Sequence, residues 1–202
     1  MRIGVVALQG AVREHLDAFG RCGVDSCEIR SPEELATVDG AVLPGGESTT
    51  IGMLLERNRL HQALKERAVA GMPLWGTCAG MILMACEVLD GLPGQRGLEL
   101  LELRVRRNAF GRQVDSFETL LEVPLLGKEP FPAVFIRGPL AESAGTGVDV
   151  LARHEGKIVA VRKDGLLATA FHPELSDDTR FHRLFADIVR RSSSQGQQGR
   201  AA

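Results

Sequence analysis

The chain has 202 residues, 44% of them hydrophobic and 25% charged, and a formal net charge of −2 at pH 7. This length suits one domain with one substantial core, and so small a net charge gives no basic field that would recruit nucleic acid or an anionic membrane. No apolar run approaches the ~20 residues of a membrane-spanning helix, so we expect neither nucleic acid nor membrane as a partner.

The first half of the chain alternates short apolar runs with helical patterns. Continuous apolar strands separated by helices are typical of βαβ units and of a parallel sheet that is covered on both faces. We predict a break near Asn58 in the longest helical segment. The predicted strands are 2–8, 25–30, 40–43 and 73–75, and the predicted helices are 11–20 and 50–70.

The pattern changes after Asp90, where six short β-like runs are separated by Gly, Pro or Asp residues. The fourth and fifth runs resemble a hairpin around Glu155 and Gly156. A closing helix is predicted over 177–191, with Ser176 or Asp177 as its N-cap. The six runs are 98–106, 116–123, 133–137, 148–154, 157–162 and 166–171.

These elements predict one α/β domain over residues 1–191, with an open, twisted, mostly parallel or mixed sheet and helices on both faces, as in flavodoxin-like folds. The last segment, 192–202 (SSSQGQQGRAA), has almost nothing to bury. We therefore expect it to be a disordered C-terminal tail.

The segment Gly-Thr-Cys-Ala-Gly at 76–80 lies between a predicted strand and an apolar helical pattern. A reactive side chain between two glycines at such a junction is the layout of a nucleophile elbow. Glycine removes the Cβ clash where the two arms of the tight turn approach each other, and the N-terminal end of the following helix favours a thiolate. Cys78 is therefore the predicted nucleophile.

A base for this thiol is predicted in the segment Phe-His-Pro-Glu at 171–174. His172 ends a predicted strand, and Glu174 lies two residues on, which in extended geometry places both side chains on one face. A carboxylate beside the imidazole selects its tautomer and stabilises the imidazolium. A strand end followed by a surface glutamate is the alternative, but with the elbow upstream we favour a Cys78–His172–Glu174 triad.

The loop Pro-Gly-Gly-Glu-Ser at 44–48 follows the third predicted strand. Consecutive glycines let backbone N–H groups turn toward a developing oxyanion, so the N–H groups of Gly46 and Ala79 are predicted to form an oxyanion hole. A plain turn with an N-cap in the Ser-Thr-Thr segment is the alternative. Because ligands of open α/β sheets gather at the carboxyl ends of the strands, this loop, the elbow and the Gln9–Gly10 loop are expected on one rim.

The remaining polar side chains carry weaker signals. The four cysteines have no metal-ligand spacing, so no metal site is predicted, and a reducing cytoplasm fits a chain with a catalytic thiol. Cys22, Cys27 and Cys86 are interpreted as packed small residues, and His15, His61, His154 and His182 as structural. The basic cluster of Arg104, Arg106, Arg107 and Arg112 suits either a substrate carboxylate or a solvated strand face.

Together these motifs resemble the triad-type (class I) glutamine amidotransferases. More closely, the chain resembles the glutaminase subunits of the two-component pyridoxal 5′-phosphate synthases. The segments that carry this resemblance follow in order from Arg2 to about Arg190: GVVALQGAVREH at 4–15, LPGGESTT at 43–50, the elbow, RNAFGRQVDSFE at 107–118, FIR at 135–137 and FHPE at 171–174.

The resemblance implies a glutaminase that hydrolyses L-glutamine to glutamate and ammonia through a γ-glutamyl thioester. It implies no cofactor for this subunit, pyridoxal 5′-phosphate being the product of the complex, and it implies a barrel-shaped synthase subunit as partner in a hetero-oligomer. Gln9 and Gly10 fall on a loop near the active site and the synthase interface. The positions that fall on the family's glutamine-binding residues are Gly46, Glu47, Ser48, Arg107, Ile136 and Arg137.

Three alternative functions remain at this stage. In the first, the chain is a glutaminase subunit of another ammonia-channelling synthase. In the second, it is a cysteine hydrolase of related fold that transfers no ammonia. In the third, it is an inactive subunit that only shapes a partner. The complete set of Cys78, His172 and Glu174 disfavours the last, because a binding module has no need of it.

Overall fold

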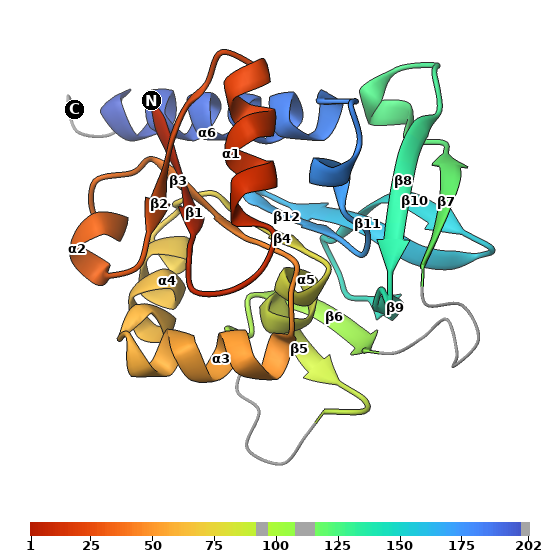
Figure 1. Ribbon diagram of the computed structural model, residues 1–202, viewed down its shortest axis with the longest axis horizontal. Helices are drawn as coiled ribbons and strands as arrows, with labels where there is room; N and C mark the ends of the chain where they lie inside the picture. Colours follow the sequence, from red (N-terminus) through yellow and green to blue (C-terminus); the bar gives the residue numbers. More distant parts are fainter. Residues whose placement is uncertain (92–96, 108–115, 199–202) are drawn as a thin grey trace.

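One mixed β-sheet runs through the computed structural model, which describes residues 1–91, 97–107 and 116–198. Its ten strands in these ranges are β1 (Arg2–Val6), β2 (Asp25–Ile29), β3 (Gly40–Leu43), β4 (Leu74–Thr77), β5 (Ala85–Val88), β6 (Leu101–Arg106), β9 (Leu140–Ala144), β10 (Asp149–His154), β11 (Lys157–Lys163) and β12 (Leu166–Thr169). The strand order is β2-β1-β3-β4-β12-β11-β9-β6-β5, and β10 pairs with β11 (Figure 1). The strands β7 (Ser116–Leu121) and β8 (Phe131–Ile136) form a separate antiparallel pair.

The strands β2, β1, β3, β4 and β12 are parallel neighbours. The strands β3 and β4 are buried along their whole length, which explains why all their residues except Thr77 are apolar instead of alternating with polar ones. Beyond β12 the sheet continues through the antiparallel pairs β12–β11, β11–β9 and β9–β6. The predicted α/β domain with a mostly parallel or mixed sheet is therefore confirmed.

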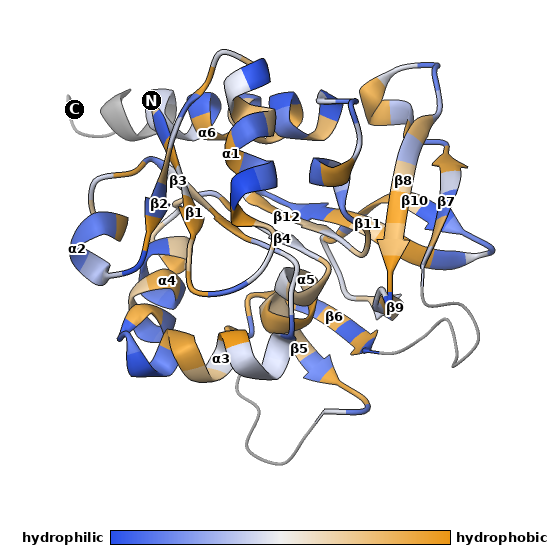
Figure 2. Ribbon diagram, viewed as in Figure 1, coloured by the Kyte–Doolittle hydropathy of each residue, from blue (hydrophilic) through white to orange (hydrophobic). Residues whose placement is uncertain are grey.

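Helices cover both faces of the sheet, with α1 and α6 on one side and α3, α4 and α5 on the other (Figure 1). Figure 2 shows mostly apolar residues along the strand β1 and alternating apolar and polar residues along β6. The predicted break near Asn58 is confirmed, because α3 ends at Arg57 and Arg59 has a left-handed φ of 59°. The helices are α1 (Val12–Arg21), α2 (Pro32–Leu35), α3 (Ser48–Arg57), α4 (Leu60–Val69), α5 (Ala79–Met84) and α6 (Arg180–Gln198).

Three short elements differ from the sequence prediction. The apolar segment after the elbow is not one helix, because α5 ends at Met84 and the chain continues as strand β5, whose partner is β6. The strand β9 and the short helix α2 were not predicted. The hairpin of β10 and β11 is confirmed, with positive φ angles of 48° at Glu155 and 77° at Gly156, as a tight two-residue turn of this kind requires.

The C-terminal helix was predicted wrongly at both ends. It begins at Arg180, where Asp178 accepts a hydrogen bond from the Arg180 backbone N–H at 2.9 Å. It continues through Gln198, so residues 192–198 are helical and not disordered, while residues 199–202 lie outside the described ranges. The hydroxyls of Ser193 and Ser194 donate to carbonyl oxygens one turn earlier, at 3.0 Å each, and so satisfy their own polar groups within the helix.

Candidate active site

Cys78 occupies a sharp turn between β4 and α5, as the sequence predicts. Its φ of 48° and ψ of −101° are strained for a residue other than glycine. A Cβ added to Gly76 would overlap the backbone of Gly80, and a Cβ added to Gly80 would overlap the carbonyl oxygen of Leu43. The two glycines are therefore required by close backbone contact on both arms of the turn.

The pairing of β4 with β12 brings the distant histidine to this turn. Thr77 lies opposite Thr169 in the parallel register, and the Cys78 backbone N–H donates to the Thr169 carbonyl at 2.7 Å. The chain leaves β12 on the same rim and reaches His172, whose ring lies with the Cys78 side chain against Gly45 and lines the same pocket. A Cβ on Gly45 would overlap the His172 ring, so the loop at 44–48, called the glycine loop below, packs directly against this ring.

His172 and Glu174 form a buried, short contact, with 2.7 Å between Nδ1 and Oε1. The pairing was predicted, but its geometry differs from the extended one expected. Glu174 lies in a 3₁₀ turn, Pro173–Leu175, that directly follows His172. The two side chains meet because the chain turns back after His172, and Pro173 suits the first position of that turn.

The two groups hold each other in their charged forms. Burial alone would lower the pKa of His172, but hydrogen bonds with Cys78 and Glu174 and their negative charges raise it to about 10. Burial disfavours the Glu174 carboxylate, yet the neighbouring His15 ring and the hydrogen bond with His172 lower the pKa of Glu174 below its usual value. A carboxylate that faces an imidazolium is the arrangement that orients a catalytic histidine.

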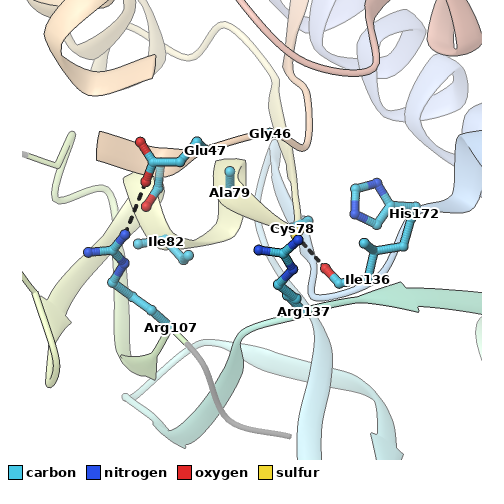
Figure 3. Close-up of a pocket in the computed structure, with 10 residues that line it drawn as sticks. Gly46, Glu47, Cys78, Ala79, Ile82, Arg107, Ile136, Arg137 and His172 are labelled. Carbon is cyan, nitrogen blue, oxygen red and sulfur yellow. Dashed lines mark hydrogen bonds and ion pairs between the residues drawn. The ribbon is translucent and has the colours of Figure 1, made fainter. Parts of the chain in front are cut away.

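A pocket of about 350 Å³ opens over Cys78 and His172. It brings together the predicted nucleophile and base, both predicted oxyanion-hole residues and every predicted glutamine-binding residue. Figure 3 shows Arg107 turned toward Glu47, with His172 on the other side of Cys78. Ile82, from α5, is a lining residue that the sequence analysis missed. The pocket is lined by Gly46, Glu47, Ser48, Cys78, Ala79, Ile82, Arg107, Ile136, Arg137 and His172.

The loop at Gln9 and Gly10 lies behind the glycine loop and does not line the pocket. Gln9 Oε1 accepts a hydrogen bond from the Glu47 backbone N–H at 2.9 Å, and the Gly45 carbonyl accepts one from the Ala11 N–H at 3.0 Å. Since C=O and N–H of a trans peptide point to opposite sides, the Gly46 N–H faces away from Ala11. The Gln9–Gly10 loop thus sets the orientation of the peptide that is predicted to contribute to the oxyanion hole.

Glu47 links the glycine loop to Arg107. Its carboxylate accepts from the backbone N–H groups of Thr49 and Thr50, at 3.1 and 2.7 Å, so Glu47, and not the Ser-Thr-Thr segment, is the N-cap of α3. Burial opposes ionisation, but these hydrogen bonds and those of the threonine hydroxyls outweigh it and lower the pKa of Glu47 to about 2. Arg107 Nη2 lies 3.1 Å from Glu47 Oε1.

The basic cluster separates into different roles. Arg104 pairs with Glu87 at 3.2 Å and Arg106 with Glu142 at 2.7 Å, both on the exposed strand face. Arg107 is the member that reaches the pocket, and Arg112 lies outside the described residues.

Cys22, Cys27 and Cys86 are free thiols away from the pocket, and Cys86 is exposed, not packed as expected.

One histidine that was interpreted as structural, His15, contacts Glu174 of the predicted triad. His15 Nε2 lies 3.4 Å from Glu174 Oε2, and both side chains are fully buried. The sequence signal was present, because His15 ends the 4–15 segment that carries the resemblance, but its spacing showed no partner.

Within the described ranges, no three His, Cys, Asp or Glu side chains are grouped as a metal site requires, and no helix has the length and apolar character to cross a bilayer.

Comparison with known proteins decides the family. Residues 5–191 match the model of the SNO glutamine amidotransferase family. The chain belongs to this family. It is 55% identical over 190 residues to "Pyridoxal 5'-phosphate synthase subunit PdxT" of Herpetosiphon aurantiacus, covering 93% of this chain and 100% of that one. A protein of the same name from Frankia alni is 56% identical over 193 residues, covering 96% and 97% of the two chains.

Solved structures agree with this family. A structure described as "Crystal structure of glutamine amidotransferase" superimposes with a TM-score of 0.87 at 46% identity, covering 93% of this chain and 98% of that chain. The fold extends to more distant proteins, such as "Structure of PurLQS from Thermotoga maritima", with a TM-score of 0.65 at 15% identity and coverage of 93% and 98%. The second likeness shows the fold alone.

Proposed function

We propose that this chain is the glutaminase subunit of a pyridoxal 5′-phosphate synthase, which hydrolyses L-glutamine and delivers the ammonia to a partner synthase subunit for vitamin B6 biosynthesis. The observation that carries the proposal is that Cys78 and His172 line one pocket and His172 contacts Glu174, in a member of the glutamine amidotransferase family. The names of relatives more than 50% identical supply the synthase.

The proposed chemistry begins with attack of the Cys78 thiolate on the side-chain amide carbon of glutamine. The oxyanion that forms accepts hydrogen bonds from the N–H groups of Gly46 and Ala79. The imidazolium of His172 gives its proton to the departing nitrogen, and ammonia leaves a γ-glutamyl thioester. Neutral His172 then takes a proton from water, which attacks the thioester, and glutamate and the thiol are released. Glu174 keeps the ring oriented in both half-reactions.

The pocket also supplies groups for the rest of the substrate. Arg107 and Arg137 place guanidinium groups in it, which suit the α-carboxylate of glutamine. Glu47 is ionised and suits the α-ammonium group. Ser48 and Ile136 complete the proposed binding site. A catalytic thiolate requires a reducing compartment, and the cytoplasm is therefore the proposed location.

A diazoketone analogue of glutamine tests the nucleophile. Intact-protein mass spectrometry is expected to show one adduct on the parent chain, and peptide mapping to place it on Cys78. The Cys78→Ala chain is expected to form none, while Cys86→Ala, which removes an exposed free thiol, is expected to react like the parent. An adduct that persists in Cys78→Ala contradicts the assignment.

The partner is tested by reconstitution with the barrel-shaped synthase subunit. Glutamine-dependent formation of pyridoxal 5′-phosphate is expected only when both chains are present, whereas ammonium salts are expected to support the synthase alone. Synthase subunits of other ammonia-consuming enzymes, which the alternatives require, serve as controls. Stimulation of glutamine hydrolysis by one of those controls, and not by the pyridoxal 5′-phosphate synthase, would reject the proposed partner.

A further inference from the structure

Two buried histidines extend the line of polar contacts behind Glu174. His15 comes from α1 and His182 from α6, and both are fully buried. His15 Nδ1 lies 3.0 Å from His182 Nε2, although the residues are 167 positions apart. The other ring nitrogen of His15, Nε2, lies 3.4 Å from Glu174 Oε2 and 3.2 Å from Thr77 Oγ1.

The polar atoms around His15 favour one of its tautomers. The second carboxylate oxygen of Glu174 has no ordinary hydrogen bond among the described residues, and neither does His182 Nδ1. With its proton on Nε2, His15 turns an N–H toward the Thr77 hydroxyl at 3.2 Å and the neighbouring Glu174 carboxylate at 3.4 Å, and it accepts at Nδ1 from the His182 Nε2–H. The nitrogen of His182 left without a partner is then an acceptor lone pair.

The opposite tautomer is worse at two positions. A proton on His15 Nδ1 would turn the Nε2 lone pair toward the carboxylate of Glu174. It would also force His182 to carry its proton on Nδ1, where a buried N–H would have no acceptor among the described residues. Orphaned buried donors are rarer than under-satisfied acceptors. The first tautomer therefore gives a line of donors that point from His182 through His15 toward the Glu174 carboxylate.

Aromatic rings enclose this pair. Trp75 packs edge-on against His15 and His182, with ring centroids 5.4 and 5.0 Å away, and Phe19 packs edge-on against His182 at 4.9 Å. Burial lowers the pKa of both histidines, so the rings are neutral. The charged groups that act on them are Glu174, His172 and Glu14 for His15, and Arg21 for His182.

We propose that His15, held in one tautomer by His182, is a positioning residue that fixes the Glu174 carboxylate against His172. The inference rests on the proposed glutaminase function of the site. Glu174 is held at Oε1 by His172 and faces the His15 N–H with Oε2, so the carboxylate cannot rotate without losing one of two contacts. A fixed carboxylate keeps the His172 ring aimed at Cys78, and small misplacements of catalytic groups cost about 10²-fold in rate.

Three substitutions at His15 separate this role from packing. Gln places an amide N–H near the position of Nε2, whereas Asn places it near Nδ1 and Leu removes both nitrogens. In the complex with the synthase subunit, His15→Leu and His15→Asn are expected to lower kcat for glutamine hydrolysis by about 10²-fold with little change in KM. His15→Gln is expected to recover most of kcat, although all three variants lose a contact with His182 or with Trp75.

The pH profile gives a second readout that packing alone would not move. Loss of His15 removes a polar N–H that faces the Glu174 carboxylate from 3.4 Å and favours its ionised form, so the acidic limb of kcat is expected at higher pH in His15→Leu than in the parent. His61→Leu is the matched control, because His61 Nε2 contacts the Gly97 carbonyl at 3.0 Å and does not line the pocket. It is expected to change the melting temperature and leave kcat and the pH profile unchanged.

Alkylation of Cys78 by iodoacetamide separates failure of this inference from failure of the proposed function. It needs no glutamine chemistry, and it is expected to be about tenfold slower in folded His15→Leu and restored in His15→Gln. A parent chain that hydrolyses no glutamine with the synthase, yet shows this alkylation pattern, rejects the proposed function only. Folded His15→Leu and His15→Asn chains that match the parent in alkylation, kcat and pH profile overturn the inference.

Discussion

Replacing Glu174 by glutamine removes the charge behind His172 and keeps almost the same side-chain volume. Oε1 lies 2.7 Å from His172 Nδ1, and two unit charges at that separation attract by about 6 kcal/mol at an effective dielectric constant of about 20. If that attraction were felt only in the transition state, its loss would lower the rate by about 10⁴-fold.

Part of the attraction is already present before the reaction. The pKa of His172 is raised to about 10, so the ring is an imidazolium in the resting site at neutral pH, and loss of the charge destabilises resting and transition states together. We therefore expect Glu174→Gln to lower kcat by roughly 10²- to 10⁴-fold, with a smaller change in KM.

The assay is glutamate release by the reconstituted complex, with ammonium-driven coenzyme synthesis as the check that the partner subunit remains active. Glu66→Gln is a matched control, because Glu66 is an exposed carboxylate on α4 that contacts Gln62 and does not line the pocket. A folded Glu174→Gln chain with kcat within about threefold of the parent would refute the electrostatic argument.

Three further changes follow from the same geometry. Arg107→Gln takes a guanidinium from the pocket, and a tenfold or larger rise in KM for glutamine, measured in the complex, is expected from the loss of about 1.5–3 kcal/mol for a charge-assisted hydrogen bond; an unchanged KM argues against a contact with substrate. Gly80→Ala puts a Cβ against the Leu43 carbonyl and is expected to lower the free energy of unfolding by about 1–3 kcal/mol in urea titrations, whereas Gly20→Ala, with open space around it, is expected to be neutral or stabilising. The pKa of His172 is about 10, against 6.5 for the free side chain, so its protonation contributes stability that is complete below pH 6.5 and is lost as the pH rises through 10. The melting temperature of the parent should therefore fall more between pH 6.5 and 10 than that of His172→Gln. Equal decreases of the two melting temperatures with pH would contradict the raised pKa.

The fold was predictable where local pattern and burial agree. The apolar runs that became β1, β3 and β4 have no polar residue at alternate positions, because they are covered on both sides. The elbow was predictable for a steric reason that needs no partner, since Gly76 and Gly80 serve the turn itself. The apolar runs and the Gly76–Gly80 contact involve residues close together in sequence, whereas the contact of Gly80 with Leu43 also needs the neighbouring strand β3.

The missed elements depend on partners far along the chain. The segment Ala85–Val88 continues an apolar helical pattern, and its strand conformation follows from pairing with β6. The segment Leu140–Ala144 is rich in alanine, and it becomes a strand because it fits between β6 and β11. The extension of α6 past Ser192 is an exception, because the hydroxyls of Ser193 and Ser194 donate to carbonyl oxygens only four positions earlier.

The candidate site shows the same division. The sequence supplied Cys78, His172 and Glu174 because each lies in a local motif with its own chemistry. The contact of His15 with Glu174 was not visible, because three separate elements, α1, the 3₁₀ turn and α6, must pack before the two histidines and the carboxylate meet. A lone histidine on a helix face carries no sign of such a partner.

A single sheet contact accounts for most of the site. The register of β4 against β12 places Thr77 beside Thr169, and the Trp75 indole N–H donates to the Thr169 hydroxyl at 3.3 Å, across 94 positions of sequence. A slip of one residue would turn the side chains of β12 to the opposite face and break both contacts. The chain between these strands forms the antiparallel half of the sheet and returns to the site with Ile136, whose carbonyl lies 3.9 Å from the Cys78 sulfur. The placement of the thiol beside the imidazole depends on the register of β4 and β12 and not on that half of the sheet.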